Sequence, residues 1–131
     1  KVLPAVSLVR FSGMMPYCMG TDRIAVDIQG LTDPFIARMP KNPKAEWISG
    51  GVNRLISDGY LTSLSEHTNK ITDARIASYY EKLSLVTQSE HIFSTDRLMT
   101  IIKFNLGHYD ELLQDYIRAS TTTNLPDDKP Q

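Results

Sequence analysis

The chain of 131 residues contains one cysteine, Cys18, and no apolar run near the roughly twenty residues that a transmembrane helix needs. A single cysteine excludes an internal disulfide framework and favours a reducing, intracellular compartment. Without a long apolar run or a signal-peptide pattern, we expect no membrane association. The formal net charge of −1 gives no overall attraction to nucleic acid, so any such affinity requires a local cluster of basic residues.

The sequence patterns of common catalytic sites are also missing. The chain has no glycine-rich phosphate loop, no HExxH, CxxC or GxSxG motif and no calcium loop. The three histidines occur singly among polar residues, a pattern more typical of solvated side chains than of metal ligands. We therefore predict a non-enzymatic protein with no catalytic residues, no cofactor and no metal site.

What is present indicates a folded domain, because 41% of the residues are hydrophobic and 22% are charged. We expect an α+β fold in which a short N-terminal β-hairpin or extended segment precedes a helical bundle of four to five helices. Residues 1–119 are predicted to form one globular domain, and residues 120–131 a mobile tail without periodicity. The chain starts at Lys1 rather than methionine, from which we expect a fragment or a processed product.

The first thirty residues are β-prone. Two short runs rich in β-branched residues, 6–11 and 23–28, are predicted to pair as a hairpin. The sequence between them, GMMPYCMG, is too long for a tight turn and is typical of a loop packed by its own side chains. We expect its sulfur-containing side chains to be buried as packing residues: Met14, Met15, Cys18 and Met19.

The central stretch, residues 44–61, has the apolar period of an amphipathic helix that ends at Gly59. A shorter helix over residues 34–39 is predicted before it, because Thr32 or Asp33 is a suitable cap and Pro34 fits the first helical position. The prolines at positions 40 and 43 would form the turn between the two helices. The central helix is predicted to contact the C-terminal helices through Trp47, Val52, Leu55 and Ile56.

Residues 31–64 resemble a winged helix-turn-helix DNA-binding domain. The resemblance is carried by Leu31-Thr32, by Ala37, by Val52 and Leu55, and by the sequence DGYL at residues 58–61. It implies a helix-turn-helix unit over residues 31–61 that places the central helix in the major groove of duplex DNA. Four basic residues of this region are the predicted nucleic-acid contacts: Arg38, Lys41, Lys44 and Arg54.

Residues 72–119 are predicted to be helical, with caps at Thr72-Asp73 and at Ser94-Thr95-Asp96 and with a junction or break at Gly107. Residues 70–83, KITDARIASYYEKL, resemble a helix of interferon gamma, an all-helical dimeric cytokine. The resemblance implies a helical partner surface. Its predicted partner-binding residues are Tyr79, Tyr80, Leu112, Leu113 and Tyr116.

Three functions from different classes follow from these observations. The first is a non-enzymatic nucleic-acid-binding module of helix-turn-helix type, with duplex DNA as the partner. The alternative is a helical protein-protein interaction or structural protein, such as a viral structural component or a cytokine-like dimer, with a homo-oligomer or another protein as the partner. The third is an enzyme that uses the loop carboxylates Asp22, Asp27 and Asp33.

Overall fold

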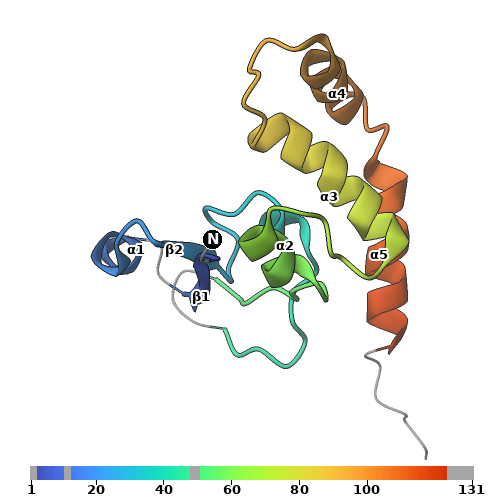
Figure 1. The fold of residues 1–131 in the computed structure, drawn as a ribbon. Helices are drawn as coiled ribbons and strands as arrows, with labels where there is room; N and C mark the ends of the chain where they lie inside the picture. The colour runs from blue at the N-terminus through green and yellow to red at the C-terminus, as the bar shows by residue number, and fades with distance from the viewer. Residues whose placement is uncertain (1–2, 11–12, 48–50, 124–131) are drawn as a thin grey trace, which may run out of the picture.

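The computed structural model describes residues 3–10, 13–47 and 51–123, and it confirms the predicted α+β fold. Two short strands precede a set of helices, with α4 at the end of the molecule away from the sheet (Figure 1). No helix of the described residues is long and apolar enough to cross a membrane. The elements are β1 (Ala5–Val9), α1 (Met14–Met19), β2 (Arg23–Asp27), the 3-10 helix η1 (Ile36–Arg38), α2 (Tyr60–Glu66), α3 (Ala74–Thr87), α4 (Thr95–Asn105) and α5 (Asp110–Thr123).

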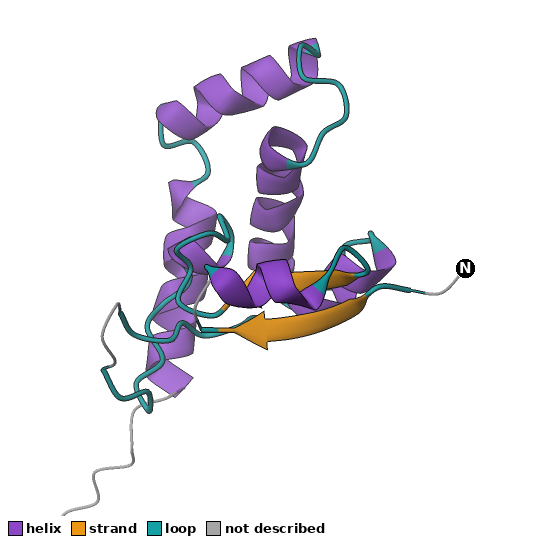
Figure 2. Cartoon of the chain, turned by 90° about the vertical axis from the view of Figure 1, so that its left-hand side faces the viewer, coloured by secondary structure: helices purple, strands orange, loops and turns teal. Residues whose placement is uncertain are grey.

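The two strands pair in parallel, so the predicted hairpin is wrong. Ala5 lies opposite Arg23 and Val9 lies opposite Asp27. The connection between the strands contains α1 and is long enough to return the chain to the end of the sheet where β1 begins (Figure 2), as a parallel pair requires. β-propensity predicted both strands, but it gives no information on their relative direction.

The side chains of α1 are not packing residues of the core, which corrects the prediction made for this segment. Met14, Met15 and Tyr17 are exposed, Cys18 is exposed, and none of the six residues of α1 is buried. The helix that packs on β1 is α2, whereas α1 stands to one side of the sheet (Figure 1). Apolar composition predicted burial here, but Met19 is only half-buried, and the other three sulfur-containing side chains are exposed.

Two aspartates organise the chain after β2. Asp27 is 1% exposed, and its carboxylate accepts hydrogen bonds from the backbone N–H groups of Gln29, Leu31 and Thr32 at 2.9, 2.8 and 3.1 Å. Asp33 accepts hydrogen bonds from the N–H groups of Phe35 and Ile36, both at 2.9 Å. These carboxylates satisfy backbone donors that have no partner in a helix or sheet.

The predicted helix at residues 34–39 is only the 3-10 turn η1, although the Asp33 cap at its start is present. Met39 has an extended backbone, with ψ of 153°, and Pro40 follows it. Because a residue that precedes proline is pushed out of the helical region, the turn cannot continue.

The predicted helix at residues 44–61 is wrong. Residues 44–47 and 51–59 contain no helix, and Tyr60 and Leu61 begin the separate helix α2; residues 48–50 lie outside the described residues. Lys41 and Arg54 instead form an isolated antiparallel bridge, flanked by hydrogen bonds that join residues 42 to 53 and 55 to 40. Gly59 has a positive φ of +84°, but it precedes α2 and does not end a helix.

The failure of this helix removes Trp47 from the predicted core contact, because its side chain is 74% exposed. Val52, Leu55 and Ile56 are half-buried, and only Ile56 of these packs against the main hydrophobic cluster. The apolar side chains of this stretch are therefore partly buried by packing within a loop and not by a helix. Extended segments can bury residues at the same spacing without forming a helix.

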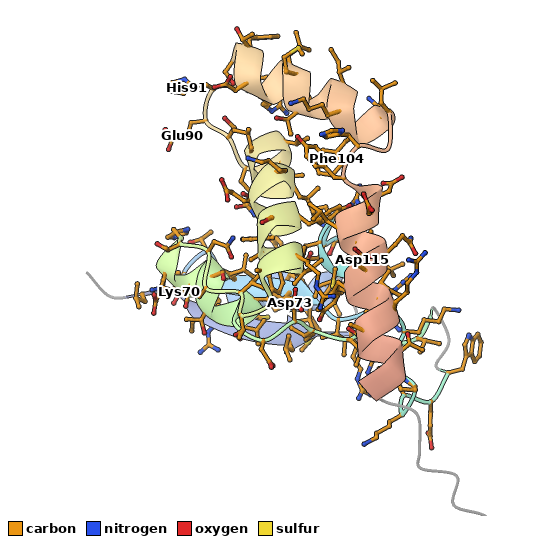
Figure 3. All side chains as sticks on the ribbon, turned by 90° about the vertical axis from the view of Figure 1, so that its right-hand side faces the viewer. Lys70, Asp73, Glu90, His91, Phe104 and Asp115 are labelled. Atoms are coloured by element: carbon orange, nitrogen blue, oxygen red, sulfur yellow. The ribbon has the colours of Figure 1, made fainter. Side chains whose placement is uncertain are left out.

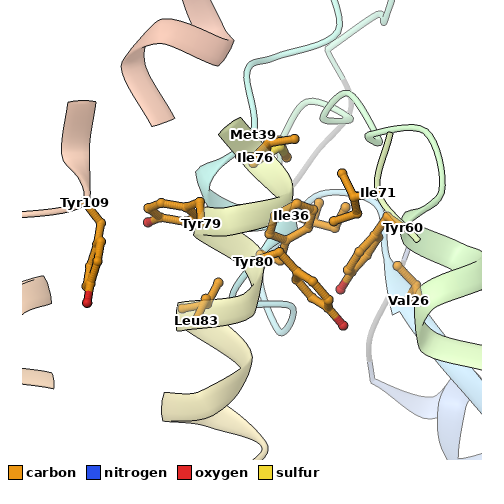
Figure 4. Close-up of a cluster of buried hydrophobic side chains, with 11 residues drawn as sticks. Val26, Ile36, Met39, Tyr60, Ile71, Ile76, Tyr79, Tyr80, Leu83 and Tyr109 are labelled. Atoms are coloured by element: carbon orange, nitrogen blue, oxygen red, sulfur yellow. The ribbon is translucent and has the colours of Figure 1, made fainter. Parts of the chain in front are cut away.

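The core is centred on three aromatic rings from separate segments. The centroids of Phe35 and Tyr60 lie 4.5 Å apart, and Tyr80 lies edge-on to both at 5.1 and 5.5 Å. The Tyr60 hydroxyl donates a hydrogen bond of 2.7 Å to Asp33. Burial, with the nearby Asp33 carboxylate, raises the pKa of Tyr60 well above its ordinary value. The other members of this cluster include Val26, Ile36, Met39, Ile71, Ile76, Tyr79, Leu83 and Tyr109 (Figure 4).

Both predicted helix caps in the C-terminal half are confirmed. The Asp73 side chain accepts from the N–H groups of Arg75 and Ile76 at the start of α3, and Ser94 accepts from Arg97 N–H at the start of α4. Gly107, with φ of +73°, lies between α4 and α5. Because α5 continues to Thr123, residues 120–123 are helical and the predicted tail starts too early.

Candidate interaction surface

The inner face of α4 attaches this helix to the rest of the chain. Thr100 is buried, and the Phe104 ring lies 5.5 Å from Tyr79 and 4.7 Å from Tyr109, measured between centroids. Figure 3 shows Phe104 on the side of α4 that faces the other helices. The inner face thus packs through Phe104 and the buried Thr100, with Ile101 half-buried beside them.

Arg97 fixes the loop that leads into α4. Its Nε donates to the carbonyl of Val86 at 2.9 Å, and its Nη1 donates to the carbonyl of Ile92 at 2.7 Å. One guanidinium group therefore joins the end of α3 to the loop before α4. The Ser94 hydroxyl, which accepts from Arg97 N–H at 3.3 Å, completes the start of the helix.

The outer face of α4 is more apolar than the inner face. Its positions are separated by one, three and four residues, so they lie on one side of the helix, opposite Thr100 and Phe104. The side chains of this stripe are between 44% and 79% exposed, and they are Leu98, Met99, Ile102 and Leu106.

The loop before α4 adds two more exposed apolar side chains. Ile92 is exposed, and Phe93 is 98% exposed. They line an open hollow of about 570 Å³ together with Glu90, His91 and Ser94, and Figure 3 labels Glu90 and His91 in this loop. We refer to the six apolar residues as the α4 surface: Ile92, Phe93, Leu98, Met99, Ile102 and Leu106.

The α4 surface is large for an exposed apolar patch. Phe93 can bury roughly 150–250 Å² and each of the other five side chains about 100 Å², so six that are about half to fully exposed present on the order of 500 Å² of apolar area. The largest apolar patch on a typical monomer is about 300–600 Å² and often functional. A stable protein-protein interface takes about 800 Å² from each partner, of which roughly 60% is apolar. The α4 surface therefore supplies about the apolar area that one side of an interface needs.

The residues predicted to bind a partner lie elsewhere. Tyr79 and Tyr80 are buried in the chain's own core, so their predicted role as surface contacts is corrected to core packing. Leu112, Leu113 and Tyr116 are half-buried and pack against the same cluster. Apolar periodicity predicts that a helix face is covered, but it does not distinguish a partner from the same chain. The outer stripe of α4 was missed for this reason.

The four predicted nucleic-acid contacts are only partly brought together. Lys41 and Arg54 lie opposite each other in the antiparallel bridge, and Lys44 is exposed a few residues away. Arg54 also donates from Nη1 to the carbonyl of Met39 at 2.8 Å. Arg38 is exposed and donates to the carbonyl of Pro34. Two of the four basic side chains therefore also stabilise their own loop.

The carboxylates considered for an enzyme have structural tasks or face solvent. Asp27 and Asp33 accept backbone hydrogen bonds, and Asp22 is exposed. Within residues 3–10, 13–47 and 51–123, no three histidine, cysteine, aspartate or glutamate side chains gather as they would around a metal ion. A groove of about 560 Å³ between α2 and α3 is lined largely by uncharged polar side chains. His67 and Glu81 also line it.

No protein-family model, curated protein or solved structure matches the chain. The winged helix-turn-helix resemblance therefore stays a sequence-based hypothesis.

Proposed function

We propose that the chain is a protein-protein interaction module that binds another polypeptide through the α4 surface. The observation that carries this proposal is the orientation of α4, which turns its more apolar side to solvent. Exposed apolar area is unfavourable in water, and a helix that only completed the fold would place this stripe inward. The orientation is explained if a second polypeptide covers the stripe.

The chemistry of the α4 surface favours a polypeptide as the ligand. The centres of protein interfaces are depleted in charge and enriched in aromatic residues and methionine. The α4 surface contains Phe93 and Met99, and the charged residues Asp96 and Lys103 lie beside the stripe. Apolar positions spaced by three and four residues match the ridges by which one helix packs on another.

A photoreactive amino acid in place of Ile102 tests this proposal. In the cells that produce the chain, we expect irradiation to give a discrete covalent adduct with a polypeptide, because Ile102 lies in the middle of the stripe. The same amino acid in place of Glu111, which is exposed on α5, is the matched control and should give none. If position 102 forms no adduct in cells where the folded chain is present, the proposed function is wrong.

Duplex DNA is the second candidate ligand. The observation that favours it is the bridge that places Lys41 beside Arg54, with Lys44 close in sequence. Because the two residues of such a pair lie on the same side of the ladder, two positive charges are concentrated in a chain of nearly zero net charge. Such a cluster can contact phosphates without a recognition helix.

Fluorescence anisotropy with duplex DNA at low salt tests this second candidate. If DNA is bound, Lys44→Gln should weaken binding to all sequences about equally and reduce the salt slope by about one. Lys82→Gln on α3 is the matched control, because it removes the same charge from a different surface. Undetectable binding at low salt, where attraction is strongest, would exclude DNA.

A further inference from the structure

We infer that the polypeptide that covers the α4 surface is a second copy of this chain, with the two α4 helices antiparallel around a two-fold axis. This inference rests on the proposed function and names its partner. In a two-fold interface each copy contributes the same patch, so the patch must be large enough and complementary to itself. The α4 surface meets both conditions.

The first condition is area. The six apolar side chains of each copy present on the order of 500 Å², which matches the apolar part of the roughly 800 Å² that each partner contributes to a standard interface. The stripe is a row of four apolar side chains on a helix of eleven residues, Thr95–Asn105, and its C-cap Leu106. A row of this kind packs directly against an identical row, because ridges of one helix fit the grooves of another.

The second condition is charge. Asp96 and Lys103 are seven residues apart, so they lie on the same flank of the stripe, near its opposite ends. In an antiparallel pair the same flanks of the two helices face each other with their ends exchanged. Each Asp96 would then lie beside the second copy's Lys103, and symmetry produces this ion pair twice.

A parallel pair would not make these contacts. It brings one flank of the first helix against the other flank of the second. That other flank contains Leu98 and Asn105, which carry no charge. Asp96 and Lys103 would therefore have no oppositely charged neighbour across the pair, so charge complementarity selects the antiparallel arrangement.

Sedimentation equilibrium of the full chain over a range of concentrations tests the inference. We expect a reversible dimer with a dissociation constant on the order of 10 μM or lower, since interfaces of this size bind at micromolar to picomolar strength. Ile102→Asp should make the chain monomeric while its circular dichroism spectrum stays that of the folded protein, because the side chain is exposed on the outer face. A chain that is monomeric at all concentrations would overturn the inference.

Exchanging the two charges tests the antiparallel arrangement. Asp96→Lys alone or Lys103→Asp alone would place like charges together at both ends, and we expect each to weaken the dimer about fivefold to tenfold. The double variant restores two opposite-charge pairs, so its dissociation constant should return to within about twofold of the original. Failure of the double variant to restore the dimer would contradict the antiparallel pair.

The cross-linking experiment at position 102 separates this inference from the proposed function. An adduct with twice the mass of the chain supports both. An adduct with any other mass supports an interaction module and overturns the second copy as its partner. The absence of an adduct overturns both.

Discussion

Replacing Gly59 with alanine is expected to destabilise the fold severely. The added Cβ would lie 2.0 Å from the carbonyl oxygen of Lys70 and 2.7 Å from its carbonyl carbon, so backbone would have to move. Gly59 also has φ of +84°, where a residue with a Cβ is strained. The two effects together should cost about 4 kcal/mol or more, a large part of the roughly 5–15 kcal/mol by which a domain is stable.

Urea denaturation followed by circular dichroism measures this effect. The control is Thr62→Ala, because Thr62 is an exposed residue of the same helix, α2, and the change adds no atom that would contact another segment. The control should change the free energy of unfolding by less than about 1 kcal/mol. A Gly59→Ala variant as stable as the control would show that the contact between Gly59 and Lys70 is not a requirement of the fold.

Replacing Asp27 with alanine should produce the second largest loss of stability. Alanine would leave the N–H groups of Gln29, Leu31 and Thr32 without the carboxylate that accepts their hydrogen bonds. Each hydrogen bond to a charged group contributes about 1.5–3 kcal/mol. Because the three bonds act as one unit and some donors can reach water afterwards, we expect a total loss of about 4 kcal/mol.

Thermal and urea unfolding of matched variants check this prediction. Asp22→Ala removes the same charge from an exposed position of the preceding loop and should change stability by less than about 0.5 kcal/mol. Asp27→Asn should lie between the two, since its amide has one oxygen to accept the N–H groups and one NH₂ group that repels them. Equal stability of the Asp27 and Asp22 alanine variants would contradict the structural role of the carboxylate.

The parts of the fold that sequence reasoning predicted correctly are those that depend on neighbouring residues. Asp73 and Ser94 cap helices because their side chains reach N–H groups only two or three residues away. Both β-prone runs became strands, since their β-branched residues suit an extended backbone. These signals require no knowledge of the rest of the chain.

The errors occurred where distant contacts decide the structure. The predicted central helix has suitable apolar spacing, but its own backbone is hydrogen-bonded to other segments, such as Arg54 N–H to the carbonyl of Ile28 at 2.8 Å. The parallel direction of the strands likewise depends on where the chain turns between them. Propensity is a weak preference that such tertiary contacts override.

The candidate surface could be predicted only in part. The caps and the apolar residues of α4 were visible in the sequence, and helical spacing puts Phe104 on the opposite side of the helix from Leu98 and Ile102. Spacing does not show that the side with Phe104 faces the core and the side with Leu98 and Ile102 faces solvent. That division depends on the position of Tyr79 and Tyr109, the aromatic neighbours of Phe104.

The guanidinium of Arg97 provides much of the attachment between α4 and the rest of the chain. It joins the carbonyls of Val86 and Ile92, while few buried side chains hold the helix itself. The segment between α3 and α5 is therefore held mainly by the hydrogen bonds of Arg97 at its start and by the ring contacts of Phe104 near its end. We expect its amide protons to be the first to exchange, through a local opening. A polypeptide bound to the outer stripe would stabilise this segment against local opening without contacting the core.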